Sequence, residues 1–316
     1  MVKFLVRRLA LGALVMVLLS FVCWIVFAGS LNPLWEYWNN PTVPEAVAAA
    51  KRAHLNDPVL VRYWLWLKGL FEGQGLGHTV YANTPVGPLV GSALLRSLEL
   101  VGASLVLVVL LTTIVGTLSA RHRGSPLDLG LRSFSYVAWA MPGFLLALLL
   151  YEGGIALHRH WHSYPFAVIG PPTSAGNWVQ HMALPALAVA LGFVGAYSRY
   201  LRSSLIAELG EPYAVVARAK GLSERRIVAR HVLRLALVPV ASALALDFGM
   251  FFTATLAADW VFALNGLASV FLSGTAILGD PFIIEAIVLI SAGMVVAAGI
   301  LGELACAWLD PRIRIN

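Results

Sequence analysis

Six basic side chains lie close together in one segment of a chain that otherwise carries few charges. Residues 213–239 read YAVVARAKGLSERRIVARHVLRLALVP, and the cations of this segment are Arg218, Lys220, Arg225, Arg226, Arg230 and Arg234. Apolar runs flank the segment on both sides. Such a cluster either holds a loop on the cytoplasmic side of a bilayer, where lysine and arginine accumulate, or presents a surface to another protein.

The other residues of this segment indicate a helix, a stop and a second helix. Pro212 suits the first position of a helix, and Gly221 suits the position just past a helix C-terminus. Ser223 and Glu224 suit the cap and the first turn of a second helix. Three small residues would let a partner approach closely: Ala214, Ala217 and Ala219. A loop held by charge alone needs no such order, so we expect a docking site, with the charge tether as the alternative.

A second group of chemically active side chains reads HRHWH and contains His158, His160 and His162. On a β-strand these alternating histidines would share one face, and imidazole is a common ligand of transition metals. No cysteine or carboxylate completes the set nearby. We therefore expect a polar, aromatic loop at the level of the lipid headgroups and no metal, with a metal site as the alternative.

A single acidic residue, Asp247, lies deep within an apolar run. An ionisable group in a bilayer is costly, so we expect it to face protein or a water-filled path. A carboxylate that lines such a path would attract a solute that carries a cationic amine. The alternative is a carboxyl group that is hydrogen-bonded at a helix contact.

The motifs of several enzyme classes are absent from the sequence. It contains no Gly-x-x-x-x-Gly-Lys-Ser/Thr, so it does not bind ATP through a P-loop. It also lacks His-Glu-x-x-His and the Gly-x-Ser-x-Gly serine expected of an intramembrane protease. We therefore expect no enzymatic activity and no cofactor. Among membrane proteins without enzymatic activity, an ATP-independent carrier is one alternative. Such carriers usually have several intramembrane charges, whereas this chain has Asp247 as its single deep one.

The bulk composition places these residues in a polytopic membrane protein. The chain has 316 residues, 59% of them hydrophobic and 12% charged, whereas a soluble domain has about 25% charged residues. About 20 apolar residues cross a bilayer as a helix. Six runs qualify, so we predict an all-α fold with six transmembrane helices near residues 9–28, 97–119, 133–151, 181–198, 237–258 and 283–307.

The distribution of basic residues predicts the orientation. With both termini in the cytoplasm, 16 of the 22 lysines and arginines lie on the cytoplasmic side, as the positive-inside rule expects. We divide the chain into a first helix (1–28), an extracytoplasmic region (29–96) and a five-helix core (97–316). The core contains the basic loop, at about 199–236. In the outer region, RYWLWLKGLF is expected to form a short amphipathic helix at the membrane surface.

The motifs along the chain resemble those of one transporter family. ARAKGL followed by HVLRLALVP resembles the EAA-type loop of binding-protein-dependent ABC importer permeases, and in particular the permease B type of the dipeptide, oligopeptide and nickel importers. FLVRRL, GLGHT and the terminal LDPRIRIN, with Asp310, Pro311 and Arg312, match in order and spacing. Departures include GSLNP at residues 29–33, and Asp259 and Asn265 in the slot of a Glu-x-x-Phe-x-x-Pro-Gly motif.

This resemblance implies the type I ABC importer permease fold and a role in transport. In that family the loop holds a coupling helix that docks into a cytoplasmic ATPase. The matching positions here are Tyr213, Ala217, Arg218, Ala219, Lys220, Gly221 and Leu222. The implied partners are a second homologous permease, two ATP-binding subunits and an extracytoplasmic substrate-binding protein. The implied substrates are di- or oligopeptides, with nickel or another small solute as the alternative.

Overall fold

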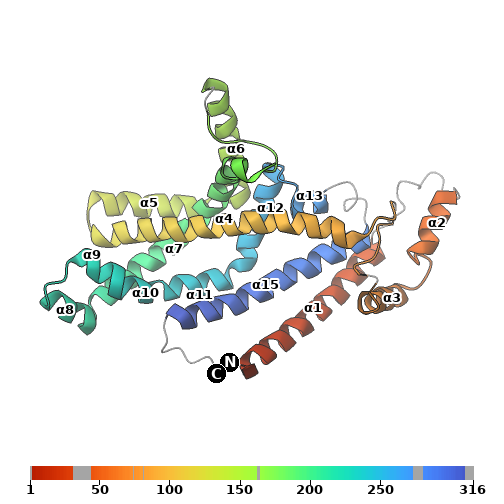
Figure 1. Cartoon of the computed structure of the whole chain (residues 1–316), viewed down its shortest axis with the longest axis horizontal. Coiled ribbons are helices and arrows are strands. Elements are labelled where there is room, and N and C mark those ends of the chain that lie inside the picture. Colours follow the sequence, from red (N-terminus) through yellow and green to blue (C-terminus); the bar gives the residue numbers. More distant parts are fainter. Residues whose placement is uncertain are drawn as a thin grey trace. The chain divides into compact units, whose positions relative to one another are not determined.

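The computed structural model describes residues 2–30, 44–73, 75–80, 82–161, 164–272 and 280–309. Within these ranges the chain forms helices and turns and no β-strand, and the predicted all-α class is confirmed. His162 and the terminal residues Asp310, Pro311 and Arg312 lie outside the described residues. The α-helices of Figure 1 are α1 (Val2–Ser30), α2 (Pro44–Arg52), α3 (Val59–Phe71), α4 (Val86–Arg121), α5 (Pro126–Ala140), α6 (Gly143–His160), α7 (Trp178–Leu209), α8 (Pro212–Ala219), α9 (Glu224–Ile227), α10 (Leu233–Ala236), α11 (Val238–Leu246), α12 (Phe248–Val261), α13 (Leu267–Leu272) and α15 (Pro281–Leu309).

Five helical runs in the described part of the chain are long and apolar enough to cross a membrane. They are Val6–Phe27, Val86–Arg121, Ala175–Leu209, Glu224–Leu246 and Pro281–Leu309. A sixth span results if α5 and α6, which bend by 106° at a short break, count as one broken span. The structure therefore supports the predicted multi-span helical class, while two of the predicted spans differ in detail.

The third predicted span, 133–151, is wrong as one straight helix, because the chain turns at Met141 and Pro142. Both residues have extended backbone angles, with ψ of 131° and 136°. Proline disfavours the helical conformation in the residue before it and cannot donate a backbone hydrogen bond, so α5 ends here and α6 begins in a new direction.

The fifth predicted span, 237–258, is also not one regular helix. It falls on α11 and α12, which meet at Asp247 with φ of −86° and ψ of 4°. Figure 1 shows the two helices running in different directions. The apolar run that could span a membrane starts earlier, at Glu224, so it includes the helix predicted for the basic segment.

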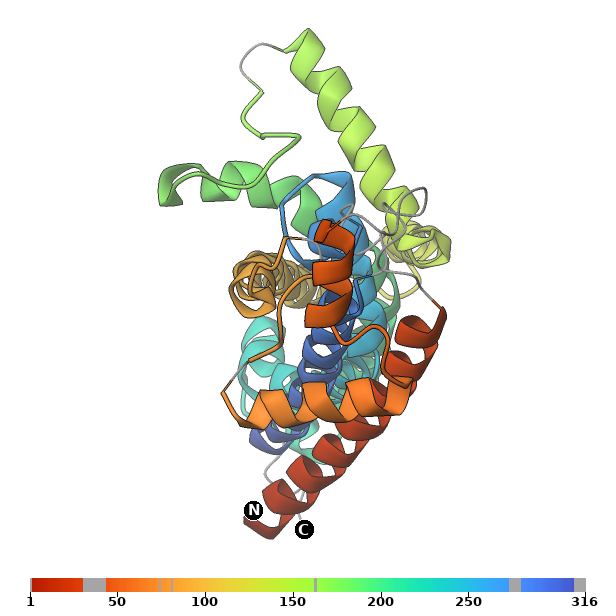
Figure 2. The same cartoon turned by 90° about the vertical axis from the view of Figure 1, so that its right-hand side faces the viewer.

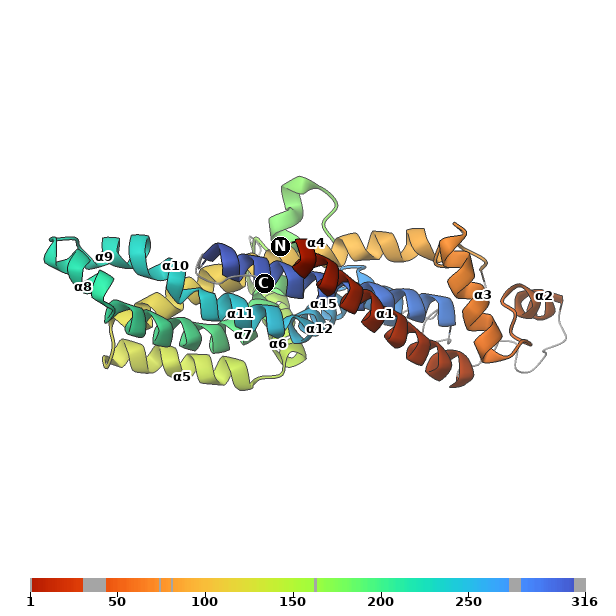
Figure 3. The same cartoon turned by 90° about the horizontal axis from the view of Figure 1, so that it is seen from below.

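The structure divides into two compact units, and the first comprises residues 1–4, 99–262 and 297–316. Its centre is α7, which packs against α5, α6, α11 and α12. Figure 3 shows α5 running beside α7. Small residues permit this approach: a Cβ atom added at Gly195 would lie 2.5 Å from the backbone oxygen of Ser135. The Ser135 and Ser198 hydroxyls lie 3.1 Å apart across the same contact.

The second unit comprises residues 5–98 and 263–296, and it is held by aromatic packing. Trp24 of α1 stacks on Trp66 of α3, with ring centroids 5.4 Å apart, and Phe282 meets Trp24 edge-on at 5.7 Å. Ser20 and Tyr63 share a hydrogen bond of 2.8 Å. Figure 2 shows α3 lying across the C-terminal end of α1. The helix predicted from RYWLWLKGLF is therefore confirmed as α3.

Candidate functional site

The chain leaves α7 through a short turn that sets the start of α8. Gly210 ends α7, Glu211 occupies the cap position with an extended backbone, and Pro212 is the first residue of α8. Proline fits there because that position has no intrahelical hydrogen bond to lose. The Tyr213 hydroxyl donates to the Glu208 carboxylate at 2.5 Å and so ties the first turn of α8 back to the end of α7.

The end of α8 is a Schellman turn centred on Gly221. The Leu222 amide donates to the Ala217 carbonyl at 3.3 Å, and the Gly221 amide donates to the Arg218 carbonyl at 3.0 Å. These two bonds satisfy carbonyls that the helix leaves unpaired at its end. Gly221 has φ of +80°, a conformation that residues with a Cβ atom rarely adopt. The predicted glycine stop is confirmed, and its sharp reversal brings α9 beside α8 (Figure 1).

The two faces of α8 differ in burial. Ala214 and Ala217 are 0% and 7% exposed, whereas Val215 and Val216 are 50% and 53% exposed. The expectation that Ala214 and Ala217 face a partner is wrong, because residues three apart share one helix face and this face packs on the chain itself. Only Ala219 of the three alanines is exposed. Sequence reasoning missed the two valines, which form the free apolar surface of the helix.

The exposed end of α8 is pinned to α9 by one ion pair. The Arg218 Nε atom lies 2.5 Å from the Glu224 carboxylate, and both side chains are about half exposed. Contact with this carboxylate raises the pKa of the Arg218 guanidinium. Exposed pairs contribute little to stability, so the pair orients the turn more than it stabilises the fold. Lys220 is exposed beside it.

The second helix of the basic segment is not regular. Ser223 occupies its cap position, as predicted, but its side chain makes no capping bond. Residues Val228–Val232 form a π-helical turn between α9 and α10. One face of this run is buried, at Ile227, Val228, Val232 and Ala236. The opposite face exposes Arg225, Arg226 and Arg230, and the Arg234 guanidinium reaches the Trp308 ring and backbone oxygen.

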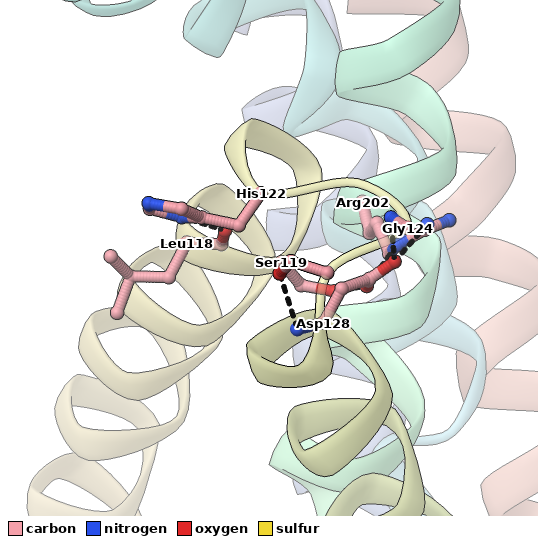
Figure 4. Close-up of polar contacts among 7 residues, drawn as sticks. Leu118, Ser119, His122, Gly124, Asp128 and Arg202 are labelled. Atoms are coloured by element: carbon pink, nitrogen blue, oxygen red, sulfur yellow. Dashed lines mark hydrogen bonds and ion pairs between the residues drawn. The ribbon is translucent and has the colours of Figure 1, made fainter.

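A buried ion pair braces the helix that leads into α8. The Asp128 carboxylate, on α5, receives two bonds from the Arg202 guanidinium of α7, at 2.9 Å and 2.8 Å. It also accepts from the Ser119 hydroxyl at 2.5 Å and from the Gly124 amide at 3.0 Å. Figure 4 shows these groups converging from α4, the following turn, α5 and α7.

Asp128 was missed in the sequence, although a signal was present. Ser125 caps α5 and accepts the Asp128 amide at 3.2 Å. Serine followed by an acidic residue three positions later is a common helix-start pattern. Here the acidic side chain turns instead toward Arg202 of α7.

Asp247 lies at the junction of α11 and α12, half-buried, and accepts a hydrogen bond of 3.3 Å from the Tyr197 hydroxyl. Tyr197 is fully buried on α7. The carboxyl group therefore faces protein on one side, as expected for an acidic residue within an apolar run. It lies on a different element from the predicted coupling residues.

The histidines do not have the strand geometry that a shared metal face requires. His158 and His160 belong to the last turn of α6, where residues two apart point in different directions. Basic residues are favoured in that turn because they complement the negative end of the helix dipole. Within the described residues no group of three or more His, Cys, Asp or Glu side chains could hold a metal ion.

Comparison with protein families gives two matches that together cover almost the whole chain. Residues 112–315 match the binding-protein-dependent transport system inner membrane component. Residues 1–115 match the N-terminal domain of the membrane components of these transport systems.

Individual relatives match along their full lengths. The oligopeptide transport system permease protein OppB of Mycobacterium bovis is 30% identical over 329 aligned positions, covering 100% of both chains. AppB of Bacillus subtilis, also named as an oligopeptide permease, is 27% identical over 99% of this chain and 100% of its own. The metal-staphylopine import system permease CntB of Staphylococcus aureus is 29% identical over 99% of each chain.

The fold also matches a solved structure. An inward-facing structure of the MetNI methionine ABC transporter has a TM-score of 0.57 and 15% identity, and the match covers 71% of this chain and 98% of that one. This likeness supports the predicted type I importer permease fold. The two family matches and the full-length relatives lead to one conclusion: the chain belongs to the family of inner membrane components of binding-protein-dependent transport systems.

Proposed function

We propose that this chain forms part of the translocation pathway of an ATP-driven peptide importer and that α8 is its coupling helix. The observation that carries the coupling role is the construction of α8. Its alanine face packs on its own chain, its valine face is open, and a Schellman turn at Gly221 fixes its angle to α9. A helix built in this way can receive a push on its open face and pass it to α7.

The proposed partners follow from the family and from the lack of a P-loop in the sequence. A second homologous permease would complete the pathway, two ATP-binding subunits would dock on α8 and its counterpart, and an extracytoplasmic binding protein would deliver the substrate. ATP binding would draw the two coupling helices together and open the pathway outward. Hydrolysis would then reset it, so this chain converts the motion of its partners into a change of access.

Peptides are the proposed substrate class because relatives matching over the full length are named as oligopeptide permeases. A metal complex of a small organic carrier is the second candidate, and it rests on the equally complete match to a metal-staphylopine permease. A competition assay decides between them. Uptake of a labelled tripeptide should be blocked by unlabelled peptides and unaffected by a metal–chelator complex, and the reverse pattern would overturn the peptide assignment.

The coupling role is tested at the open face of α8. Val216→Asp places a charge on the docking surface, and we expect ATP-dependent uptake to fall at least tenfold and the ATPase subunits to be lost on purification. Val216→Thr keeps the shape of the side chain and should retain most of both. Equal membrane levels of the two variants are the control. Normal ATP-driven uptake by Val216→Asp would contradict the assignment.

A further inference from the structure

A cavity of about 520 Å³ lies in the unit that contains α2 and α3. Its walls come from these two helices, from the glycine-containing segment 75–80 and from Asn83, and its floor is aromatic, with Trp24, Trp66 and Phe282. The Trp66 indole donates to the Leu76 carbonyl at 3.4 Å, which joins the floor to the glycine segment. No part of this cavity belongs to the α8 region.

The cavity carries an excess of positive charge. Arg52, Arg62 and Lys68 line it, against one carboxylate, Glu72. Lys68 and Glu72 lie 3.4 Å apart and largely offset each other. Arg52 and Arg62 also line the cavity, and the nearby Asp57 carboxylate acts on the Arg62 guanidinium, so Arg52 contributes the net positive charge. Arg62 is only 8% exposed, and burial lowers the pKa of its guanidinium, although arginine stays protonated. A cation in the wall of a cavity attracts an anion that enters, and this attraction is stronger there than in bulk water.

Two apolar helical runs end beside the cavity, and their ends indicate its depth in a membrane. Trp24 is near the end of the apolar run Val6–Phe27, and Phe282 is the second residue of the run Pro281–Leu309. A site between the ends of two spans is at the boundary of the hydrocarbon core. The outer face of α3 exposes Trp64 and Phe71, at 63% and 83%, which is typical of a helix that rests in the membrane interface.

These observations favour a ligand that combines an anion with an apolar body. We propose that the cavity binds the phosphate headgroup of an anionic phospholipid through Arg52 and Arg62. Guanidinium groups match phosphate oxygens with paired hydrogen bonds. The aromatic floor would contact the glycerol and the first methylene groups of the lipid. A free phosphate ester shares the anionic chemistry but lacks the apolar part.

The test uses the full chain purified in a neutral detergent and follows its thermal unfolding. Phosphatidylglycerol should raise the unfolding temperature, whereas phosphatidylethanolamine and soluble glycerol phosphate at the same concentration should not. Arg52→Gln should weaken the apparent affinity for phosphatidylglycerol at least fivefold. Lys51→Gln removes the neighbouring exposed cation, which does not line the cavity, and should leave the affinity unchanged.

Arg62→Gln should weaken the affinity for phosphatidylglycerol more than Arg52→Gln does. Arg62 is buried, so its variant can fail to fold, and Arg52→Gln then still tests the proposal. Three results would overturn the lipid assignment. One is an equal shift from phosphatidylethanolamine, another is a full shift from glycerol phosphate, and the third is an equal loss of affinity in Lys51→Gln and Arg52→Gln. None of these measurements depends on transport, so their outcome is separate from that of the proposed coupling role.

Discussion

The carboxylate of Asp128 joins three parts of the chain around a single pair of oxygen atoms. It accepts two hydrogen bonds from the Arg202 guanidinium, one from the Ser119 hydroxyl and one from the Gly124 amide. The side chains of Asp128 and Arg202 are 3% and 19% exposed. Removal of one partner from such a pair leaves an ion that is poorly solvated, which is more costly than removal of both. The brace therefore fixes α5 against α7 at the end from which α8 begins.

We expect Asp128→Ala to lower the free energy of unfolding by about 3 kcal/mol, since it strands the Arg202 cation. The double variant Asp128→Ala with Arg202→Ala should lose less than the sum of the two single variants. A thermal-unfolding cycle on the purified protein measures this coupling. The exposed pair Arg218–Glu224 serves as the control, and its cycle should show a much smaller coupling. Additive losses at Asp128 and Arg202 would contradict the brace.

The carboxyl group of Asp247 gives a second prediction at the residue scale. Its half-buried position at a helix junction fits a side chain that meets the substrate. If it attracts the amino terminus of a peptide, Asp247→Asn should reduce the uptake of free peptides at least fivefold. Uptake of the N-acetylated forms should change little, and Asp247→Glu should retain selectivity. An equal effect on both peptide forms would assign Asp247 to the Tyr197 contact alone.

At the scale of elements, α5 and α7 depend on a close approach at one glycine. A Cβ atom at Gly195 would lie 2.5 Å from the Ser135 oxygen, whereas one at Gly192 would lie 3.6 Å from a Leu146 methyl group. We expect Gly195→Ala to destabilise the protein by about 1–3 kcal/mol through overpacking. Gly192→Ala should be neutral or slightly stabilising, because alanine favours the helix. Unfolding in urea compares the two, and equal stabilities would refute this account of the contact.

The start of α15 carries a pH-sensitive tether. The buried Asp280 carboxyl group accepts the Val80 amide at 2.7 Å and the Phe282 amide at 3.1 Å. Burial raises the pKa of Asp280 from 3.8 to about 6, against the opposite effect of these hydrogen bonds. A raised folded-state pKa means that the folded protein holds the proton more tightly than the unfolded chain does. The contribution of Asp280 to the free energy of unfolding is therefore largest below about pH 4 and falls as the pH rises through 6, because burial penalises the ionised carboxylate.

We expect thermal unfolding of the wild-type protein to show this loss between pH 4 and pH 7. A shift of two pKa units corresponds to about 3 kcal/mol. Asp280→Asn has no proton to lose and can still accept the Val80 amide, so its stability should vary less over this range. An unchanged pH dependence in Asp280→Asn would show that other groups are responsible.

At the scale of the whole molecule, the sequence predicted the ends of helices correctly where a single residue restricts the backbone angles. Pro212 starts α8 and Gly221 ends it, as predicted from their allowed backbone angles. The bend at Met141 and Pro142 also had a local signal, which is the proline itself. The apolar run continues across it, so we predicted a single span there. The burial of Ala217 and the reach of Arg202 to Asp128 depend on which helices pack together. No pattern within one segment contains that information, so the open valine face and the brace required the structure.

The orientation of the molecule in the membrane follows from charge and remains a prediction for the whole chain. Positive-inside asymmetry places α8 in the cytoplasm and α3 outside. Cys23 and Cys306 are first replaced by alanine, and single cysteines are then introduced at the exposed Ser223 and Asn56. A membrane-impermeant maleimide added to intact cells should label Asn56→Cys, and Ser223→Cys should react only after lysis. The cysteine-free protein is the blank. The reverse pattern would place α8 beyond the reach of any cytoplasmic ATPase and would remove the basis for coupling.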